Sequence, residues 1–343
     1  MMIMDRDEQE LKSMGLLGIY KESYRLIFRF PKIFTQITLT LILPLSIIFL
    51  SHNQVSNILH RRIIHVSTTA DDVVSSPLTV YILIKATYFT FLLVFSLLAT
   101  SAVVYTVACI YTSGDVAAVA FRAVVTAVVP TVWKRLIITF LCTFFVFCTY
   151  NFVFLVTLFS VFLFFATFSD NFLVGQAVVY LVLAAYGFGF VYMSVVWQVA
   201  GVVTVLEESY GFAAMVRSKG LINAGGMTAS LTVIFLTLNA PLAVIGGFFK
   251  EFVEDEDYYY FGVVTRIGIG ALCLVALMKV ILLGLVVQTV VYFVCKAKAA
   301  AAGHNGGGAA FGNLDLADRL EGYLGEYYVP LKAKDVVLEE FRV

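Results

Sequence analysis

Four polar residues stand inside apolar segments of this chain, where such side chains are costly. Lys279 lies near the middle of the apolar run 263–294, too deep on either side for its ammonium to reach water easily. An ionisable group at that depth is destabilising unless it is paired, so it is a candidate functional group. No apolar run carries a carboxylate at comparable depth. The candidate intramembrane site is therefore the set Lys279, Asn239, Asn151 and Gln198.

Two roles remain open for this set. Lys279 either contacts a lipid headgroup or a solute from a polar bundle interior, or it only holds helices together. Asn239 stands just before Pro241, which frees a backbone carbonyl. Such a broken helix can coordinate an ion or a substrate, but the asparagine can equally serve only to repair the kink.

Two further positions carry chemistry at the cytosolic ends of apolar runs. Glu207 closes the fourth run and is expected to form an ion pair with Arg217, as a structural clamp. Cys295 directly follows the last run, beside Lys296 and Lys298, which makes it a candidate for S-palmitoylation.

The sequence carries no signature of an enzyme. His52, His60 and His65 share one short segment, but without a cysteine or carboxylate framework they are weak evidence for a metal site. The chain contains no phosphate-binding loop, dinucleotide fingerprint, nucleophile elbow or zinc-protease motif. We therefore expect no catalytic residues, no bound metal, no cofactor and no direct contact with nucleic acid.

The elements that must position these residues are membrane spans. Hydrophobic residues make up 61% of the 343 residues and charged residues 13%, against roughly 45–50% and 25% in soluble domains. Six runs are long enough to cross about 30 Å of hydrocarbon. They are residues 33–50, 78–111, 136–168, 177–206, 227–249 and 263–294. The chain thus divides into an N-terminal segment 1–32, a membrane domain 33–294 and a tail 295–343.

The distribution of basic residues predicts the orientation. If the N-terminus is cytosolic, the inner segments hold 17 Lys and Arg residues and the outer segments hold four. An excess of this kind on the inner side is typical of membrane proteins. We therefore expect both termini in the cytosol, in an endomembrane such as the endoplasmic reticulum or in the plasma membrane.

Amphipathic segments precede the odd-numbered runs. In the first segment, a basic stripe recurs at helical spacing beside the apolar positions Leu17, Tyr20, Tyr24 and Ile27. A helix of this composition is typical of the anionic headgroup layer. Residues 115–129 and 212–222 are expected to form similar elbow helices. The membrane-surface basic stripe consists of Lys21, Arg25, Arg29 and Lys32.

An internal repeat accompanies these elbows. Residues 40–48 and 237–245 share the pattern T-L-x-x-P-L-x-[IV]-I, and both lie in runs that cross from inside to outside. Copies in the same direction indicate a parallel repeat of an elbow helix plus a helical hairpin, used three times. The predicted fold class is all-α: a six-span helical bundle with cytosolic elbow helices.

Two stretches resemble a known family. Residues 30–44, which begin Phe-Pro-Lys-Ile-Phe-Thr-Gln-Ile-Thr-Leu-Thr, and the tail from Tyr323 to Val343 resemble a plant-specific family of uncharacterised six-span transmembrane proteins. The core is more distantly similar to the bacterial membrane domain attached to glycerophosphodiesterases. There an acidic residue is followed by an Ala-x-x-Arg-Ser elbow, matched here by Glu207 and residues 214–218. The bacterial activity resides in a separate soluble domain, so the resemblance implies a fold and no catalysis.

The functional expectation is a non-enzymatic membrane organiser or scaffold. Its partners would be bilayer lipids and a cytosolic protein that binds residues 314–343, a polar segment following the Ala/Gly-rich stretch 299–312. The alternative is a transporter or channel for a lipid or small solute, with Lys279 and Asn239 lining the path.

Overall fold

The computed structural model describes residues 14–51, 77–113, 129–168, 172–207, 209–254 and 262–301. Within these ranges the architecture is helical, and six helices are long and apolar enough to cross a membrane. They correspond to the six predicted runs, with ends displaced by a few residues. The spans are Pro31–Ser51, Ile82–Tyr111, Val132–Phe165, Leu173–Leu206, Thr228–Val253 and Val264–Ala299.

Two short helices accompany the long ones. Helix α2 (Leu16–Arg29) precedes the first span, and α9 (Phe212–Ala224) precedes the fifth. The third expected elbow, residues 115–129, lies almost entirely outside the described residues. The remaining elements are α3 (Pro31–Ile37), η1 (Thr38–Ile42), α5 (Pro77–Ser113), α7 (Val129–Phe168), α8 (Phe172–Leu206), α10 (Thr228–Phe249), η4 (Lys250–Glu254) and α11 (Val263–Ala301).

Local sequence explains where the short helices end. Pro31 occupies the first turn of α3, where its missing N–H removes no hydrogen bond, and the chain bends at Phe30 between α2 and α3. Gly226, with φ of +60°, closes the turn between α9 and α10, a conformation that glycine adopts at little cost. Pro241 lies inside α10 without ending it, and the five-residue π-helical segment η1 comes just before Pro44.

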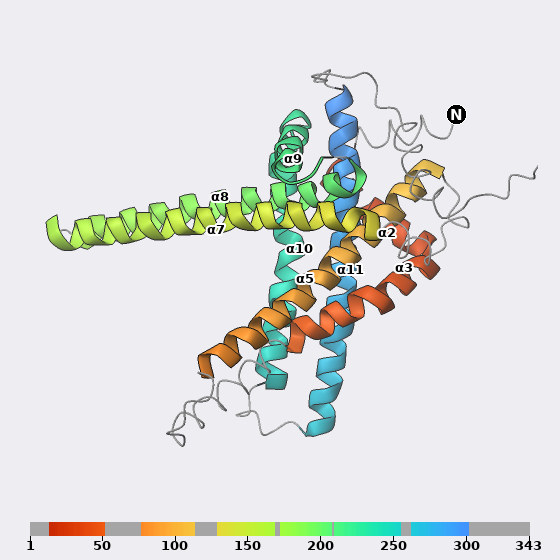
Figure 1. Ribbon diagram of the computed structural model, residues 1–343, viewed down its shortest axis with the longest axis horizontal. Coiled ribbons are helices and arrows are strands. Elements are labelled where there is room, and N and C mark those ends of the chain that lie inside the picture. Colours follow the sequence, from red (N-terminus) through yellow and green to blue (C-terminus); the bar gives the residue numbers. More distant parts are fainter. Residues whose placement is uncertain are drawn as a thin grey trace, which may run out of the picture.

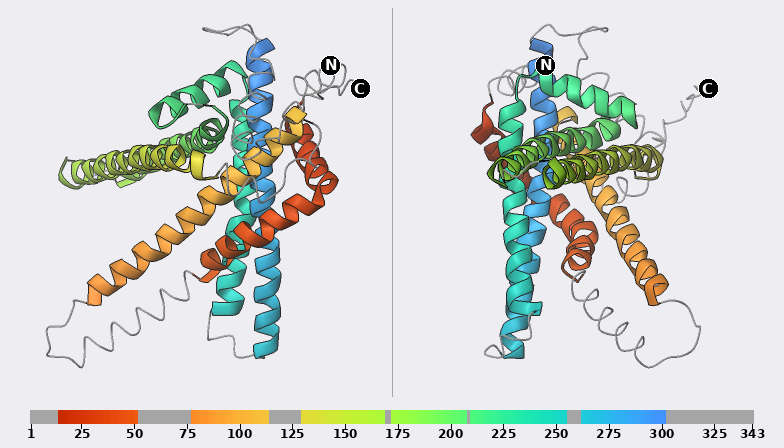
Figure 2. Two further views of the ribbon diagram at one scale, coloured as in Figure 1. Left: turned by 45° about the vertical axis from the view of Figure 1, so that its right-hand side comes forward. Right: turned by 90° about the vertical axis from the view of Figure 1, so that its left-hand side faces the viewer.

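The long helices form three hairpins. The helix of residues 31–51 runs beside α5, α7 packs along α8, and α10 packs along α11. Figure 1 shows that α7 and α8 run crosswise to α10 and α11, while α5 takes a third direction. The second helices of the hairpins, α5, α8 and α11, contact one another in all three pairings. Figure 2 shows the hairpins diverging from this common region.

The core of the molecule is the place where these three helices converge, which we call the vertex. It consists of residues 99–109 of α5, 195–206 of α8 and 286–295 of α11, most of which are fully buried. The three stretches are rich in valine, alanine and threonine. Small side chains allow helix backbones to approach closely, which is how helices pack where lipid removes the hydrophobic drive for association.

Away from the vertex, the spans carry exposed apolar surface. The most apolar stretch of α7 contains no buried residue, and that of α8 contains almost none. Phe145, Phe152 and Phe159 of α7 and Leu181 of α8 are all more than half exposed. An apolar surface of this extent needs a solvent other than water.

The two described elbow helices wrap around the vertex. Helix α2 packs on α11, and α9 packs on α8 and α11. Each elbow has buried residues at a spacing of four and then three: Ile19, Ser23 and Leu26 in α2, and Ala214, Ser218 and Leu221 in α9, which also buries Met215 and Ile222. The elbows therefore lie at the same end of the molecule as the C-terminal parts of α5, α8 and α11.

Candidate functional site

The junction between α8 and α9 is fixed by hydrogen bonds to α7. Gly211, with φ of +64°, donates its backbone N–H to Oγ1 of Thr139 at 2.8 Å. The same hydroxyl lies 3.0 Å from Oγ1 of Thr204 on α8. A side chain at position 211 would be strained by the positive φ, so glycine is needed where the chain leaves α8 and turns into α9.

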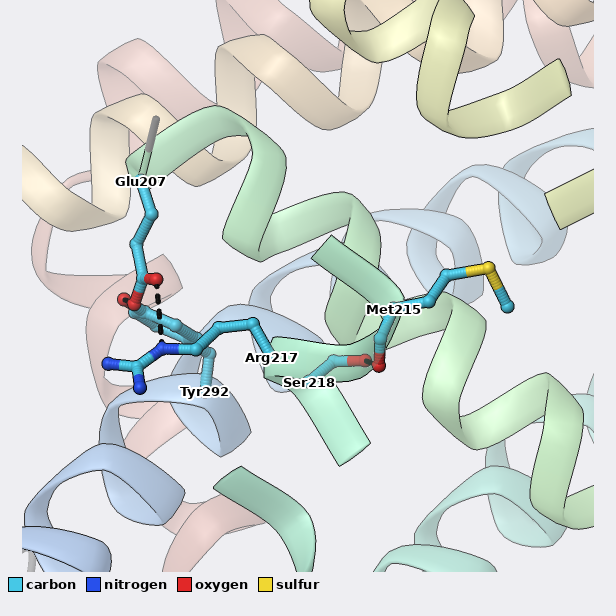
Figure 3. Close-up of polar contacts among 5 residues, drawn as sticks. All are labelled: Glu207, Met215, Arg217, Ser218 and Tyr292. Atoms are coloured by element: carbon cyan, nitrogen blue, oxygen red, sulfur yellow. Dashed lines mark hydrogen bonds and ion pairs between the residues drawn. The ribbon is translucent and has the colours of Figure 1, made fainter. Parts of the chain in front are cut away.

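A polar cluster forms where this turn meets α11. The carboxylate of Glu207 accepts a 2.7 Å hydrogen bond from the hydroxyl of Tyr292 through Oε1. Its other oxygen, Oε2, accepts from Nε of Arg217 at 3.2 Å. Figure 3 shows the three side chains, which join the end of α8, α9 and α11. The structure thus brings Glu207 and Arg217 together and adds Tyr292, a residue that the sequence did not single out.

The exposure of these three side chains differs along the cluster. Tyr292 is fully buried, the Glu207 side chain is 17% exposed and the Arg217 side chain is 50% exposed. The carboxylate therefore connects a buried phenol to a guanidinium at the surface. Because the Arg217 end is half exposed, the ion pair alone contributes little. The buried Tyr292–Glu207 hydrogen bond is the stronger part of the link.

Ser218 anchors α9 against α8 on the next turn. Its hydroxyl lies 2.9 Å from the carbonyl of Met215 and 3.2 Å from the carbonyl of Val196 on α8 (Figure 3). The side chain is fully buried, and the neighbouring Ala214 is also fully buried. The alanine lets the two helices approach and the serine supplies the polar contact, which accounts for these residue types at this spacing.

This cluster has the properties of a structural joint. Both carboxylate oxygens of Glu207 accept hydrogen bonds. The hydrogen bonds of Ser218 go to backbone carbonyls, and neither a histidine nor an acidic side chain is among its partners. Within the described ranges, no three His, Cys, Asp or Glu side chains gather in a way that could hold a metal ion. The geometry supports a structural link between α8, α9 and α11.

The four predicted intramembrane residues lie on different helices: Asn151 on α7, Gln198 on α8, Asn239 on α10 and Lys279 on α11. In the part of the chain that the structure describes, no hydrogen bond joins any two of them. Asn239 donates to the carbonyl of Phe235 in its own helix at 2.7 Å. Gln198 is half-buried, and the Lys279 side chain is exposed.

Asn151 has a partner on the facing helix of its hairpin. It accepts a 2.8 Å hydrogen bond from the hydroxyl of Tyr186 and donates to the carbonyl of Phe147 at 2.7 Å. The Tyr150 hydroxyl donates to the carbonyl of Tyr186 at 2.9 Å, and the two tyrosine rings stack with centroids 5.3 Å apart. These contacts hold α7 against α8, so Asn151 serves its own hairpin.

The basic stripe lies at the surface. Lys21, Arg25, Arg29 and Lys32 are all exposed. Leu17 and Phe28 of α2 are also exposed, at 82% and 76%, on the side of the helix opposite the buried residues Ile19 and Leu26. Helix α2 thus has one apolar face against α11 and a second apolar strip, flanked by basic residues, that faces away from the protein.

Several other predicted positions can be placed. Cys295 is fully buried, next to Gly225, so its thiol is not presented to an acylating enzyme in this arrangement, and the burial does not favour palmitoylation. The three histidines at 52, 60 and 65 and the tail segment 314–343 lie outside the described residues.

Comparison with known proteins gives one match. The model of a family described as "Domain of unknown function (DUF8558)" matches residues 4–341. No curated protein and no solved structure matches the chain. Because the matched region includes the spans, both described elbows and the polar cluster at the vertex, the chain belongs to the DUF8558 family of domains of unknown function.

Proposed function

We propose that this protein is a non-enzymatic membrane organiser that gathers anionic lipid at the cytosolic face of its membrane and offers its tail to a cytosolic partner. The observation that carries the proposal is the outward face of α2, where exposed apolar side chains lie beside an exposed basic stripe. That combination matches the headgroup region of a bilayer, which is apolar on one side and anionic on the other.

The apolar strip of α2 has no protein to cover it in the described structure. Leu17, Tyr24 and Phe28 follow one another at helical spacing, and the rings of Tyr24 and Phe28 stack with centroids 6.4 Å apart. Moving a leucine or phenylalanine side chain from water into an apolar phase contributes about 1.5–3 kcal/mol. Insertion of this strip below the headgroups would therefore hold α2 firmly at the membrane surface.

The basic stripe supplies the preference for anionic lipid. Lys21, Arg25 and Arg29 follow the apolar strip along one side of α2, and Glu22 offsets part of the charge through its contact with Arg25 at 3.5 Å. Each lysine or arginine near an anionic surface contributes about 1 kcal/mol. Three such residues would enrich anionic lipid around the elbow.

The orientation follows from the same residues. Helices α2 and α9 and the C-terminal end of α11 lie at the vertex end of the molecule, where Arg217, Lys219 and Lys298 add to the basic stripe. The excess of basic residues on the inner segments favours the cytosol for this end. Both termini would then be cytosolic, with the hairpin tips on the other side.

The α7–α8 hairpin is too long to stand upright in a bilayer. A 34-residue helix such as Val132–Phe165 is about 51 Å long, whereas the hydrocarbon core is about 30 Å thick. A span of that length must tilt strongly or leave the hydrocarbon at one end. Hairpins that tilt in different directions from one vertex would admit lipid between them.

An internal repeat would explain why three hairpins share one vertex. The three second helices contain Val103-Val104-Tyr105, Val202-Val203-Thr204 and Val290-Val291-Tyr292, all buried. The matching buried spacing in α2 and α9 supports the same three-unit scheme. In that scheme the elbow of each unit packs on the second helix of another unit, as α2 does on α11 and α9 does on α8.

The transporter alternative has less support. A transport path needs polar groups that converge on a cavity. Asn151 and Asn239 bond within their own hairpin or helix, and no hydrogen bond connects the four candidate residues in the described ranges.

The test is lipid enrichment around the full-length protein. Wild-type protein and the variant Lys21→Gln/Arg25→Gln/Arg29→Gln are reconstituted in vesicles of phosphatidylcholine with a minor fraction of fluorescent phosphatidylserine. Energy transfer from a dye attached near α2 to the fluorescent lipid is then measured. We expect several-fold enrichment for the wild-type protein, reduced toward the bulk composition in the triple variant and in high salt.

The matched control replaces Lys250 and Arg266 by glutamine. These two basic residues belong to the hairpin tips at the opposite end of the molecule, and their loss is expected to leave the enrichment unchanged. Equal enrichment in wild type and the α2 variant would contradict the proposal, and measured solute flux through the wild-type protein would favour the alternative.

A further inference from the structure

Lys279 is exposed on α11 although it lies within the longest apolar span. It ends a strip of exposed residues at helical spacing, preceded by Gly268, Leu272 and Val275. Val286 lies seven residues further along the same side of α11 and is fully buried in the vertex. Lys279 therefore stands at the point where α11 emerges from the packed vertex.

The elbow contacts define which part of α11 lies at the membrane surface. Lys298 donates to the backbone carbonyl of Met14 just before α2, at 3.1 Å, and Tyr292 bonds to Glu207 beside α9. The Tyr20 hydroxyl of α2 contacts Thr237 and the carbonyl of Ile234 on α10, which is antiparallel to α11. If the elbows occupy the headgroup layer, the part of α11 packed against them belongs to that layer too.

The remaining length of α11 then matches the bilayer. Residues 264–284 lie between the outer end of the span and the fully buried stretch that begins at Val286, and a helix of that length rises about 31 Å. This equals the thickness of a typical hydrocarbon core of about 30 Å. Lys279 would lie about 9 Å inside the inner boundary, a depth from which a lysine can extend its ammonium toward the headgroups.

The protein offers no anion to this ammonium in the described part of the chain. Glu207 is bonded to Arg217 and Tyr292, and Glu22 contacts Arg25. Glu251 and Glu254 belong to η4, at the opposite end of the α10–α11 hairpin. An ammonium that extends from hydrocarbon to the headgroup level is stabilised there by an anion, and the phosphates of the lipids supply one.

We propose that Lys279 binds the phosphate of an inner-leaflet phospholipid whose acyl chains lie along Leu272 and Val275. The lysine presents three N–H donors and a compact charge, which suit a phosphate oxygen, and the strip below it is apolar. This inference rests on the proposed function, because the elbows set the level of the headgroups. It adds a defined lipid site to a protein otherwise surrounded by exchanging lipid.

The test counts phospholipid that stays bound to purified full-length protein. Wild type and Lys279→Leu, Lys279→Arg and Lys250→Leu variants are extracted in mild detergent, and retained phospholipid is measured by native mass spectrometry. We expect one phospholipid per chain to remain on the wild type and on Lys250→Leu. Lys279→Leu should lose it at least tenfold more readily, and Lys279→Arg should largely keep it. Thermal unfolding of each variant shows that the fold is retained.

Three results would overturn the inference. Equal retention by wild type and Lys279→Leu would show that the lysine holds no lipid. Displacement of the lipid by millimolar inorganic phosphate would indicate a water-filled anion site. A change from dimer to monomer in Lys279→Leu, with lipid retention unaltered, would assign the ammonium to a second copy of the chain.

The α2 variant separates this inference from the proposed function. Lys21→Gln/Arg25→Gln/Arg29→Gln is expected to lose enrichment of anionic lipid while it keeps the single retained phospholipid. If enrichment is unaffected by that variant and Lys279→Leu still loses its lipid, the organiser proposal fails and the lysine site stands. If enrichment falls and retention does not depend on Lys279, the organiser proposal stands and the lysine site fails.

Discussion

Replacement of Glu207 by alanine is expected to lower the free energy of unfolding by about 1–3 kcal/mol, because it removes the carboxylate that accepts a hydrogen bond from a buried phenol. The Tyr292 hydroxyl donates to Glu207 at 2.7 Å from a fully buried side chain. The loss would also release Arg217, while α9 keeps its contact with α8 through Ser218. Thermal unfolding in detergent, followed by thiol-reactive fluorescence, measures the effect.

Two variants show whether the phenol is the cause. Glu207→Gln keeps a carbonyl oxygen as an acceptor and should lose much less stability than Glu207→Ala. In the double variant Glu207→Ala/Tyr292→Phe, removal of the hydroxyl should recover part of the loss, since the donor that Glu207 accepts from is then absent as well. Unfolding of Glu207→Ala at the wild-type temperature would contradict the joint described for this cluster.

The second large effect is expected from overfilling the vertex. Ala200 on α8 is fully buried where α5, α8 and α11 meet, and the substitution Ala200→Phe would force side chains and backbones apart. Overpacking of this kind typically costs about 1–3 kcal/mol, and more where backbones are in close contact. We expect a lower unfolding temperature and a smaller yield of monodisperse protein in detergent.

Ala185 provides the matched control on the same helix. Its side chain is exposed on the part of α8 that diverges from the other hairpins, so Ala185→Phe should be tolerated. If both substitutions destabilise the protein equally, the α8 surface around residue 185 is packed against something, and the divergence of the hairpins does not describe the protein in its membrane.

The six long apolar helices could be predicted because a run of apolar residues longer than the bilayer is thick has few other stable forms. Pro31 and the glycines at 225 and 226 stand where the short helices α2 and α9 end. The basic stripe could be predicted because a period of three to four residues places side chains on one face of a helix.

The convergence of the hairpins was not predicted, because it depends on contacts between distant segments. Apolar spans are uniform in composition, and the vertex differs only in its enrichment in valine, alanine and threonine. Val-Val-Tyr occurs in the vertex at 103–105 and 290–292, but also at 178–180 on the exposed part of α8, so this triplet does not distinguish the vertex.

The surroundings of the expected intramembrane residues could not be predicted for a different reason. Depth in the bilayer was judged for Lys279 from the ends of the apolar run, which places it near the middle. The structure shows that the last part of that run packs against the elbows. With the elbows in the headgroup layer, as proposed above, the ends of the run do not mark the membrane boundaries. Asn151 and Asn239 also lie in apolar segments. Their hydrogen-bond partners lie within their own hairpin or helix, and the amino-acid composition does not reveal those partners.

The most direct test of the account is the side of the membrane on which the vertex and the hairpin tips lie. Single cysteines are introduced at Lys219 on α9, at Leu173 near the tip of α7–α8 and at Glu251 near the tip of α10–α11, in a background without native cysteines. Sealed cells or oriented microsomes are treated with a membrane-impermeant thiol reagent before and after permeabilisation. We expect Leu173→Cys and Glu251→Cys to react from the non-cytosolic side, and Lys219→Cys only from the cytosol. Labelling of Leu173→Cys and Lys219→Cys from the same side would contradict a vertex with three hairpins crossing the bilayer from it.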